Sequence, residues 1–200
     1  MTTAHDLTIV SLEVRSDYPV ERGDLSLALA GAELADLLDA GAVSLEGRLL
    51  RPIAPPGSGD RLLDAAASLV RREPAESVED WLWRRGRGLA AEYLATAGAS
   101  DSGRRRSRWS VRPTADRPDP VDPVARRRAI DRWATGDPVL VGLAGAVGIR
   151  HASADQVVDP EDDGTAAALA AVNDAVVELA GVRQRRSIEQ AAFDNIWRGM

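Results

Sequence analysis

Cysteine and lysine are both absent from this chain of 200 residues, and aromatic residues make up only 4% of it. Without cysteine the chain can form neither disulfides nor thiolate metal sites, which suits a reducing compartment. Hydrophobic residues make up 44% of the chain, mainly leucine, alanine and valine, and this is enough for the core of one globular domain. Such a composition favours helices packed through aliphatic side chains over an aromatic-rich β-sandwich.

Long apolar runs are also missing. The longest apolar stretch, residues 138–149, is far shorter than the roughly 20 residues that a membrane-spanning helix needs. The first residues include Asp6 and no basic flank, and the apolar run at 7–14 is interrupted by Ser11 and Glu13, so we expect no secretory signal. We therefore expect a cytoplasmic protein whose association with a membrane surface is peripheral and reversible.

All 25 basic residues are arginine, and they are unevenly distributed. Residues 84–132 contain thirteen arginines and six acidic residues, a net charge of +7, which leaves −13 for the rest of a chain whose total is −6. A basic middle in an otherwise acidic protein indicates one surface that meets phosphate groups.

Helical periodicity dominates the chain, and two short segments have the pattern of β-hairpins. Residues 43–53 form two apolar runs around a Glu-Gly turn. In residues 109–123, apolar and polar side chains alternate at first, and a turn-rich stretch follows. Residues 7–14 fit either a strand or the approach to the first helix. Helices are predicted at 25–39 with Asp24 as N-cap, 60–72, 77–98, 122–133, 139–149, 165–183 and, after a capping box at Ser187, 187–197. The predicted fold is mainly α, a compact single-domain helical bundle with small peripheral β-hairpins.

Several segments, in order along the chain, resemble the Golgi phosphoprotein 3 family, in particular its actinobacterial members. Residues 27–43 are similar to the family's opening helix with its glycine and following strand. Residues 59–64 read Gly-Asp-Arg-Leu-Leu-Asp and residues 77–81 read Ser-Val-Glu-Asp-Trp, which resemble the family's Gly-Asp-x-Leu-Leu-Asp and Ser/Thr-Val-x-x-Trp. A helix ending in a glycine, here Gly98, and the 109–123 hairpin follow in the family's order. The resemblance thus defines one domain over residues 5–198.

The resemblance implies a non-enzymatic reader of phosphatidylinositol 4-phosphate, with an arginine pocket and a hairpin that assists oligomerisation and membrane contact. Counting back from Gly98 places the family's two pocket arginines, three residues apart, at Arg84 and Arg87. Helical spacing of three would put both guanidinium groups on one face, where they can bind a phosphate. The family's other pocket positions, a tryptophan and an arginine, fall on Glu21 and Ala30. The expected ligand is therefore an anionic, phosphoinositide-like headgroup.

The candidate site residues form two clusters. Three are assigned to the lipid headgroup, Arg84, Arg85 and Arg87, and three to membrane contact by the hairpin, Arg106, Arg108 and Trp109. The alternative interpretation of the first cluster is a solvated basic helix face, and that of the second is a solubilising loop.

Motifs for catalysis or metal binding are absent from the sequence. His5 and His151 are the two histidines, and nucleophile-elbow, phosphate-loop and zinc-protease motifs do not occur. Residues 159–164 resemble the start of a calcium-binding EF-hand loop, but Ala170 stands where that loop needs a glutamate. We expect an acidic turn that caps the next helix, and no enzyme activity, cofactor or metal.

Two other functional classes fit parts of the sequence. Residues 26–53 are predicted as helix, strand, turn and strand, the order of elements in the back half of a winged helix. The recognition helix would carry Glu33, Asp36 and Asp39, which a DNA duplex repels. Nucleic acid is therefore not an expected partner. The stronger alternative is a protein-interaction scaffold that forms homo-oligomers through the 109–123 hairpin without lipid specificity, and it is compatible with membrane binding.

Overall fold

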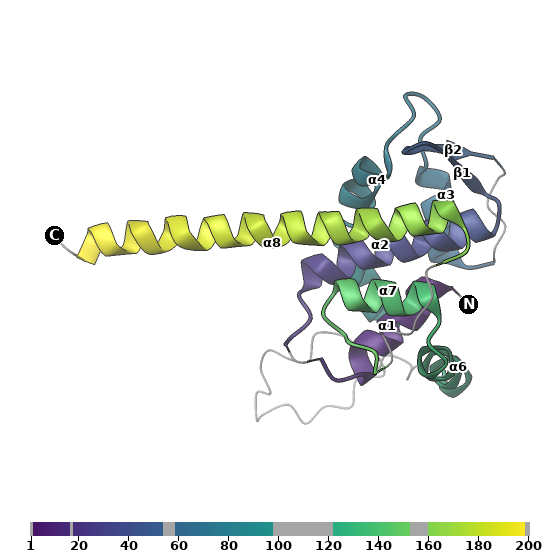
Figure 1. The fold of residues 1–200 in the computed structure, drawn as a ribbon, viewed down its shortest axis with the longest axis horizontal. Coiled ribbons are helices and arrows are strands. Elements are labelled where there is room, and N and C mark those ends of the chain that lie inside the picture. The colour runs from purple at the N-terminus through teal and green to yellow at the C-terminus, as the bar shows by residue number, and fades with distance from the viewer. Residues whose placement is uncertain (1, 17, 54–58, 98–121, 153–159, 199–200) are drawn as a thin grey trace, which may run out of the picture.

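The computed structural model describes residues 2–16, 18–53, 59–97, 122–152 and 160–198. Over these residues the chain is mainly helical with one small antiparallel sheet, as predicted. The elements in chain order are α1 (Thr3–Glu13), α2 (Arg22–Asp39), β1 (Val43–Glu46), β2 (Leu49–Pro52), α3 (Arg61–Leu69), α4 (Val78–Arg85), α5 (Leu89–Thr96), α6 (Pro123–Ala134), α7 (Pro138–Ala146) and α8 (Asp163–Arg198) (Figure 1). Residues 109–121 of the hairpin predicted at 109–123 lie outside the described residues, and the last two, Asp122 and Pro123, are the N-cap and first residue of α6.

Helix α2 is the central element of the core. Its residues from Leu25 to Ala35 are all buried. Helices α1, α5 and α7 pack against it, and α8 runs alongside it in the opposite direction (Figure 1). A close approach occurs at Gly31, where an added Cβ would lie 2.2 Å from Cγ2 of Val172 on α8. The absence of a side chain at Gly31 therefore sets how closely α2 and α8 pack.

The hairpin of β1 and β2 confirms the prediction for residues 43–53. The strands pair in register from Val43 with Pro52 to Glu46 with Leu49. Gly47 makes the turn with a φ of +63°, a left-handed conformation that glycine adopts without steric cost. Two main-chain hydrogen bonds of 2.9 Å attach the hairpin to the residues around the start of α4.

The segment predicted as one helix over 77–98 is two helices, which corrects that prediction. The start is as expected, because Oγ of Ser77 accepts a hydrogen bond from the main-chain N–H of Asp80 at 3.0 Å. Helix α4 ends at Arg85, and Gly88 then adopts a φ of +75° and caps α5. A residue in this left-handed region cannot continue a right-handed helix. The turn at 86–88 therefore redirects the chain in the middle of the predicted arginine cluster.

Ser77→Ala is expected to lower the free energy of unfolding by about 1 kcal/mol, the usual effect of losing an N-cap side chain. Urea denaturation followed by circular dichroism measures the difference. Ser77→Thr is the matched control, because threonine keeps the accepting hydroxyl group. An equal loss in both variants would show that the cap is not the cause.

Helices α1 and α2 start earlier than predicted. Residues 7–14 belong largely to α1, a separate helix instead of a strand or the approach to the helix predicted at 25–39, and Thr2 caps α1 through its side chain. The predicted N-cap at Asp24 is wrong, since α2 begins after Glu21. Asp24 lies in the first helical turn. A carboxylate stabilises a helix through the helix dipole there as well as at the N-cap, so an acidic residue in the sequence does not distinguish these two positions.

Helix α8 is continuous from Asp163 to Arg198, so the predicted start of a new helix at Ser187 is wrong. A capping box marks a helix start only where the residues before it are not helical. No proline lies between Asp163 and Arg198 to interrupt the helix before Ser187. The first half of α8 packs on α2, α4 and α7, and the second half extends beyond the body as a single helix (Figure 1). Within the described residues, Asp163–Phe193 is long and apolar enough to span a membrane, because an 18-residue window in it has a mean hydropathy of 1.4. Length and composition are the only basis for this finding, and a core helix of a soluble protein can satisfy both.

Candidate functional site

The last turn of α4 carries Arg84 and Arg85, and Arg85 is the buried one. Only 8% of its side chain is exposed, and the side chain of Glu33 on α2 is fully buried. Nε and Nη2 of Arg85 each donate to one carboxylate oxygen of Glu33 at 2.7 Å. The hydroxyl group of Tyr93 on α5 donates to the same carboxylate at 2.9 Å. One bidentate ion pair thus joins α2, α4 and α5.

Burial shifts the pKa values of all three groups. Removal from water raises the pKa of Glu33, and the hydrogen bonds from Arg85 and Tyr93 only partly oppose this. Burial acts to lower the pKa of Arg85, but the hydrogen bond and the charge of Glu33 outweigh it, and the pKa of Arg85 rises. Burial and the Glu33 carboxylate both raise the pKa of Tyr93. The upward shift of the Arg85 pKa thus agrees with the buried pair that the hydrogen bonds to Glu33 define.

Arg84 is also paired, but nearer the surface, with 26% of its side chain exposed. Its guanidinium group donates to the two carboxylate oxygens of Glu76 at 3.0 and 2.5 Å, and to the main-chain oxygen of Leu69 at 3.0 Å. Its Cζ also lies 5.3 Å from the ring centroid of Trp81, within cation–π range. These contacts attach the end of α3 to α4 and occupy much of the hydrogen-bonding capacity of Arg84.

Arg87 differs from both, because it lies in the turn between α4 and α5. Its side chain is exposed, and within the described residues it forms no ion pair or hydrogen bond. The argument from helical spacing does not apply to Arg84 and Arg87, since α4 ends between them. Arg87 lines a surface groove that neither Arg84 nor Arg85 lines.

This groove, which we call the α2–α8 groove, lies where the start of α2, the turn at 86–88 and the middle of α8 meet. It has a volume of about 310 Å³ and is lined by Arg22, Gly23, Ser26, Leu27, Trp83, Gly86, Arg87, Gly88 and Leu179. Glu21, the N-cap residue of α2, makes no side-chain hydrogen bond to the amide groups of the first turn, which within the described residues leaves this helix start without a side-chain cap. An uncapped helix start and an arginine both attract an anion.

Contacts between distant segments hold the walls of the α2–α8 groove. Arg183 on α8 donates to both carboxylate oxygens of Asp24 on α2 at 2.8 Å. On the other side, Oγ of Ser26 accepts a hydrogen bond from the main-chain N–H of Ala90 on α5 at 3.1 Å. The start of α2 is thus fixed to both α5 and α8, and the groove is set by tertiary packing.

The positions expected for the family's tryptophan and arginine lie in different surroundings. Glu21 is the exposed N-cap of α2, whereas Ala30 is fully buried, and its carbonyl oxygen accepts the indole N–H of Trp81 at 3.4 Å. Trp81 is fully buried, and Trp83 is half-buried in the groove wall. Sequence reasoning missed Arg22 and Trp83 as groove residues, because no local pattern indicates that α8 passes beside them.

The remaining predicted positions add little to the groove. Arg106, Arg108 and Trp109 lie outside the described residues, and their membrane contact stays a prediction.

The acidic turn before α8 caps that helix as expected, since a carboxylate oxygen of Asp162 accepts from the main-chain N–H of Thr165 at 2.6 Å. Hydrogen bonds from Thr165 lower the pKa of Asp162. In the part of the chain that the structure describes, no group of three or more histidine, aspartate or glutamate side chains is placed to hold a metal ion.

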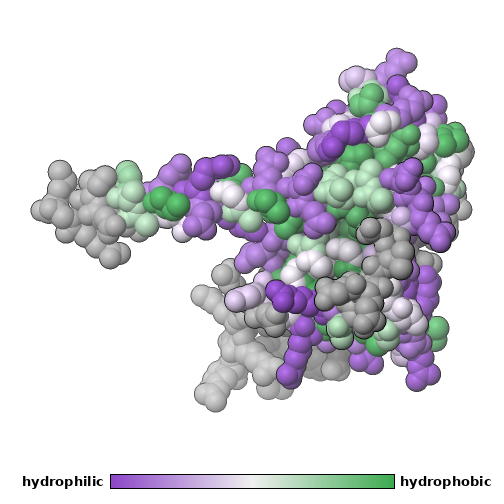
Figure 2. All heavy atoms as spheres, in the orientation of Figure 1, coloured by the Kyte–Doolittle hydropathy of each residue, from purple (hydrophilic) through white to green (hydrophobic). Residues whose placement is uncertain are grey.

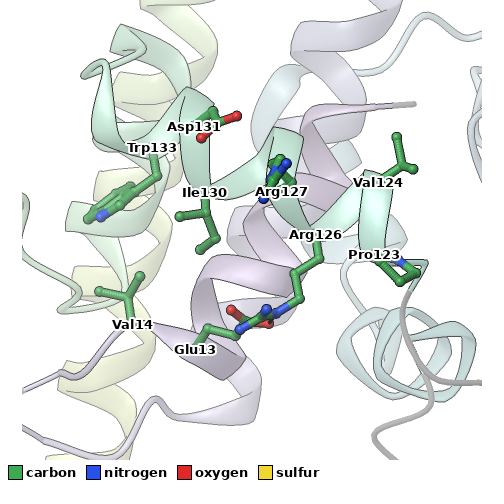
Figure 3. Close-up of a pocket in the computed structure, with 9 residues that line it drawn as sticks. All are labelled: Glu13, Val14, Pro123, Val124, Arg126, Arg127, Ile130, Asp131 and Trp133. Atoms are coloured by element: carbon green, nitrogen blue, oxygen red, sulfur yellow. Dashed lines mark hydrogen bonds and ion pairs between the residues drawn. The ribbon is translucent and has the colours of Figure 1, made fainter.

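A second groove, of about 930 Å³, lies between the end of α1 and α6 (Figure 3). Val14, Ile130 and Trp133 contribute its apolar surface, and Arg126 on its rim is paired with Glu13. It contains none of the predicted site residues, and part of its positive charge is neutralised by this pair. The α2–α8 groove with Arg87 is therefore the candidate site for an anion.

Comparison with known proteins places the chain in a family. The family model described as Golgi phosphoprotein 3 (GPP34) matches residues 4–191, which include α4 and all residues that line the α2–α8 groove. No curated protein and no solved structure gave a match. Because the family model covers most of the sequence, the chain belongs to the Golgi phosphoprotein 3 family.

Proposed function

We propose that this protein is a peripheral, non-enzymatic membrane protein that binds the phosphate of anionic lipid headgroups in the α2–α8 groove. The observation that carries the proposal is the position of Arg87, exposed and without an ion-pair partner among the described residues, at the uncapped start of α2. The protein would be cytoplasmic and would associate reversibly with the membrane surface.

The three predicted arginines have different roles in this proposal. Arg87 contacts the phosphate, with Arg22 beside it on the groove wall. Arg85 is a positioning residue, because its ion pair with Glu33 fixes the end of α4, and hence the turn that carries Arg87, against α2. Arg84 is paired with Glu76 and joins the end of α3 to α4, so it adds little net positive charge at the surface. Arg87, without an ion-pair partner among the described residues, beside the start of α2 favours general recognition of phosphate over recognition of one particular headgroup.

The two alternative functions have less support from the described residues. A winged helix would need an exposed recognition helix, but α2 is buried from Leu25 to Ala35. A scaffold that forms oligomers through the 109–123 hairpin depends on residues outside the described ranges. Headgroup binding is supported by a groove that the described residues form, with the exposed side chain of Arg87 on its wall.

Arg87→Gln is expected to weaken binding to anionic vesicles by about tenfold, because it removes a charge-assisted contact with phosphate and the attraction of one basic residue. Co-sedimentation with vesicles of phosphatidylcholine alone, or doped with phosphatidylserine or phosphatidylinositol 4-phosphate, measures the affinity. Binding should also weaken as salt is added.

Arg127→Gln is the matched control, because Arg127 is an exposed arginine of α6 that lines the second groove. It changes the net charge equally and should have a much smaller effect. Equal losses in both variants would show that binding depends on net charge and not on the α2–α8 groove. Absence of wild-type binding to every vesicle would overturn the proposed function and favour the scaffold.

A further inference from the structure

The second half of α8 stands clear of the body of the molecule (Figure 1). From Gln184 to Phe193 every side chain is exposed. This projecting segment, residues 184–193, mixes polar and apolar side chains on the molecular surface (Figure 2). Its direction is fixed just before it leaves the body, where Arg183 is bonded to Asp24 beside the α2–α8 groove.

The face of α8 that packs on the body continues along the projecting segment. Val172 is fully buried, and Leu179, seven residues later, is half-buried and lines the α2–α8 groove. Seven residues are nearly two helical turns, so Arg186 and Phe193, at the next two steps of seven, lie on the same side of the helix. That side therefore carries a groove-lining residue, then an arginine, then an aromatic ring.

We propose that the projecting segment of α8 is a second membrane-contacting element, which lies on the surface of an anionic bilayer beside the headgroup in the α2–α8 groove. This inference rests on the proposed function and adds a second contact surface to it. The groove supplies the site for one headgroup, and the Arg186–Phe193 side of α8 extends the contact area to neighbouring lipids.

Charge and exposure of the projecting segment fit an anionic lipid surface. Arg185 and Arg186 form no ion pair within the described residues, and Glu189 is the one acidic residue between 184 and 193. The side chain of Phe193 is 62% exposed. An arginine and an exposed aromatic ring on one side of a helix, here Arg186 and Phe193, suit the headgroup layer, where the ring enters the interface and the guanidinium group stays near phosphate.

The double variant Arg186→Gln/Phe193→Ser tests the proposal in the full-length chain. Its matched control is Arg185→Gln/Ile188→Ser, which removes one arginine and one exposed apolar residue from other sides of the same helix. Ile188 is 59% exposed, and five residues turn the helix so that Ile188 and Phe193 point about 140° apart. Co-sedimentation with phosphatidylserine vesicles should show binding about tenfold weaker for the first variant, and a much smaller change for the control.

The outcomes separate this inference from the proposed function. Loss of binding in Arg87→Gln with no loss in Arg186→Gln/Phe193→Ser would leave the groove as the site and overturn the role of α8. Loss in the α8 variant with none in Arg87→Gln would support the projecting segment and overturn the groove. Equal losses in the α8 variant and its control would also overturn the proposal. A wild-type dimer that the α8 variant converts to monomers, measured by light scattering, would identify a second copy as the occupant and overturn it.

Discussion

Arg85→Ala is expected to lower the free energy of unfolding by about 3–5 kcal/mol, the typical effect of removing one partner from a buried ion pair. The variant would leave the fully buried carboxylate of Glu33 with Tyr93 as its remaining hydrogen-bond donor among the contacts described. It would also weaken the attachment of α4 to α2, because two hydrogen bonds of 2.7 Å between them are lost. Urea denaturation at neutral pH measures the change.

The pH dependence of this variant gives an independent check. Burial already raises the pKa of Glu33, and removing Arg85 takes away a group that opposes this rise. A folded-state pKa above the unfolded value means that protonation favours the folded state, so the stability deficit should be smallest at acidic pH. The deficit should grow as the pH rises through the raised pKa of Glu33. A deficit that stays constant across this range would argue against a buried, unpaired carboxylate as the cause.

The double variant Glu33→Met/Arg85→Met is the control for the ion pair. It removes both charges and fills much of the space with apolar atoms, so it should be more stable than Arg85→Ala. If both variants lose the same stability, or if Arg85→Ala loses less than about 1 kcal/mol, the ion pair does not hold the helices together.

Gly31→Ala is expected to destabilise the protein by about 3 kcal/mol, because a methyl group would overlap a well-packed neighbour. The added Cβ would lie 2.2 Å from Cγ2 of Val172, so either the Val172 side chain or the spacing of α2 and α8 must change. Because α8 also forms a wall of the α2–α8 groove, the same variant should weaken vesicle binding. Thermal denaturation and co-sedimentation measure the two effects.

Gly145→Ala on α7 is the matched control, since an added Cβ there has no neighbouring atom within 4 Å. It should be neutral or stabilising by up to about 1 kcal/mol through the better helix propensity of alanine. The double variant Gly31→Ala/Val172→Ala should recover part of the loss, because the shortened side chain makes room for the methyl group. No recovery would mean that contact with Val172 is not the source of the destabilisation.

Local patterns in the sequence determined which elements form and where several of them begin. The hairpin at 43–53 was predicted from two short apolar runs around a glycine, and although the turn is at Gly47 and Arg48, one residue later than predicted, both strands and the turn lie close together in the chain. The caps at Ser77 and Asp60 are equally local, since each side chain accepts a hydrogen bond from an N–H two or three residues later. The family resemblance rests on the same segments and agrees with the family match.

Tertiary packing alone decided which arginines are paired, which one is exposed, and how long α8 is. In sequence Arg84, Arg85 and Arg87 form one basic cluster, but their surroundings depend on partners that the local pattern does not contain. Glu33 is 52 residues from Arg85, and Asp24 is 159 residues from Arg183 at the groove. Local hydrogen bonds can be inferred from neighbouring residues, whereas charge pairing and groove formation require segments that are distant in sequence to meet. The sequence therefore predicted a phosphate-binding middle, and only the fold separated the exposed Arg87 from two arginines that hold the structure together.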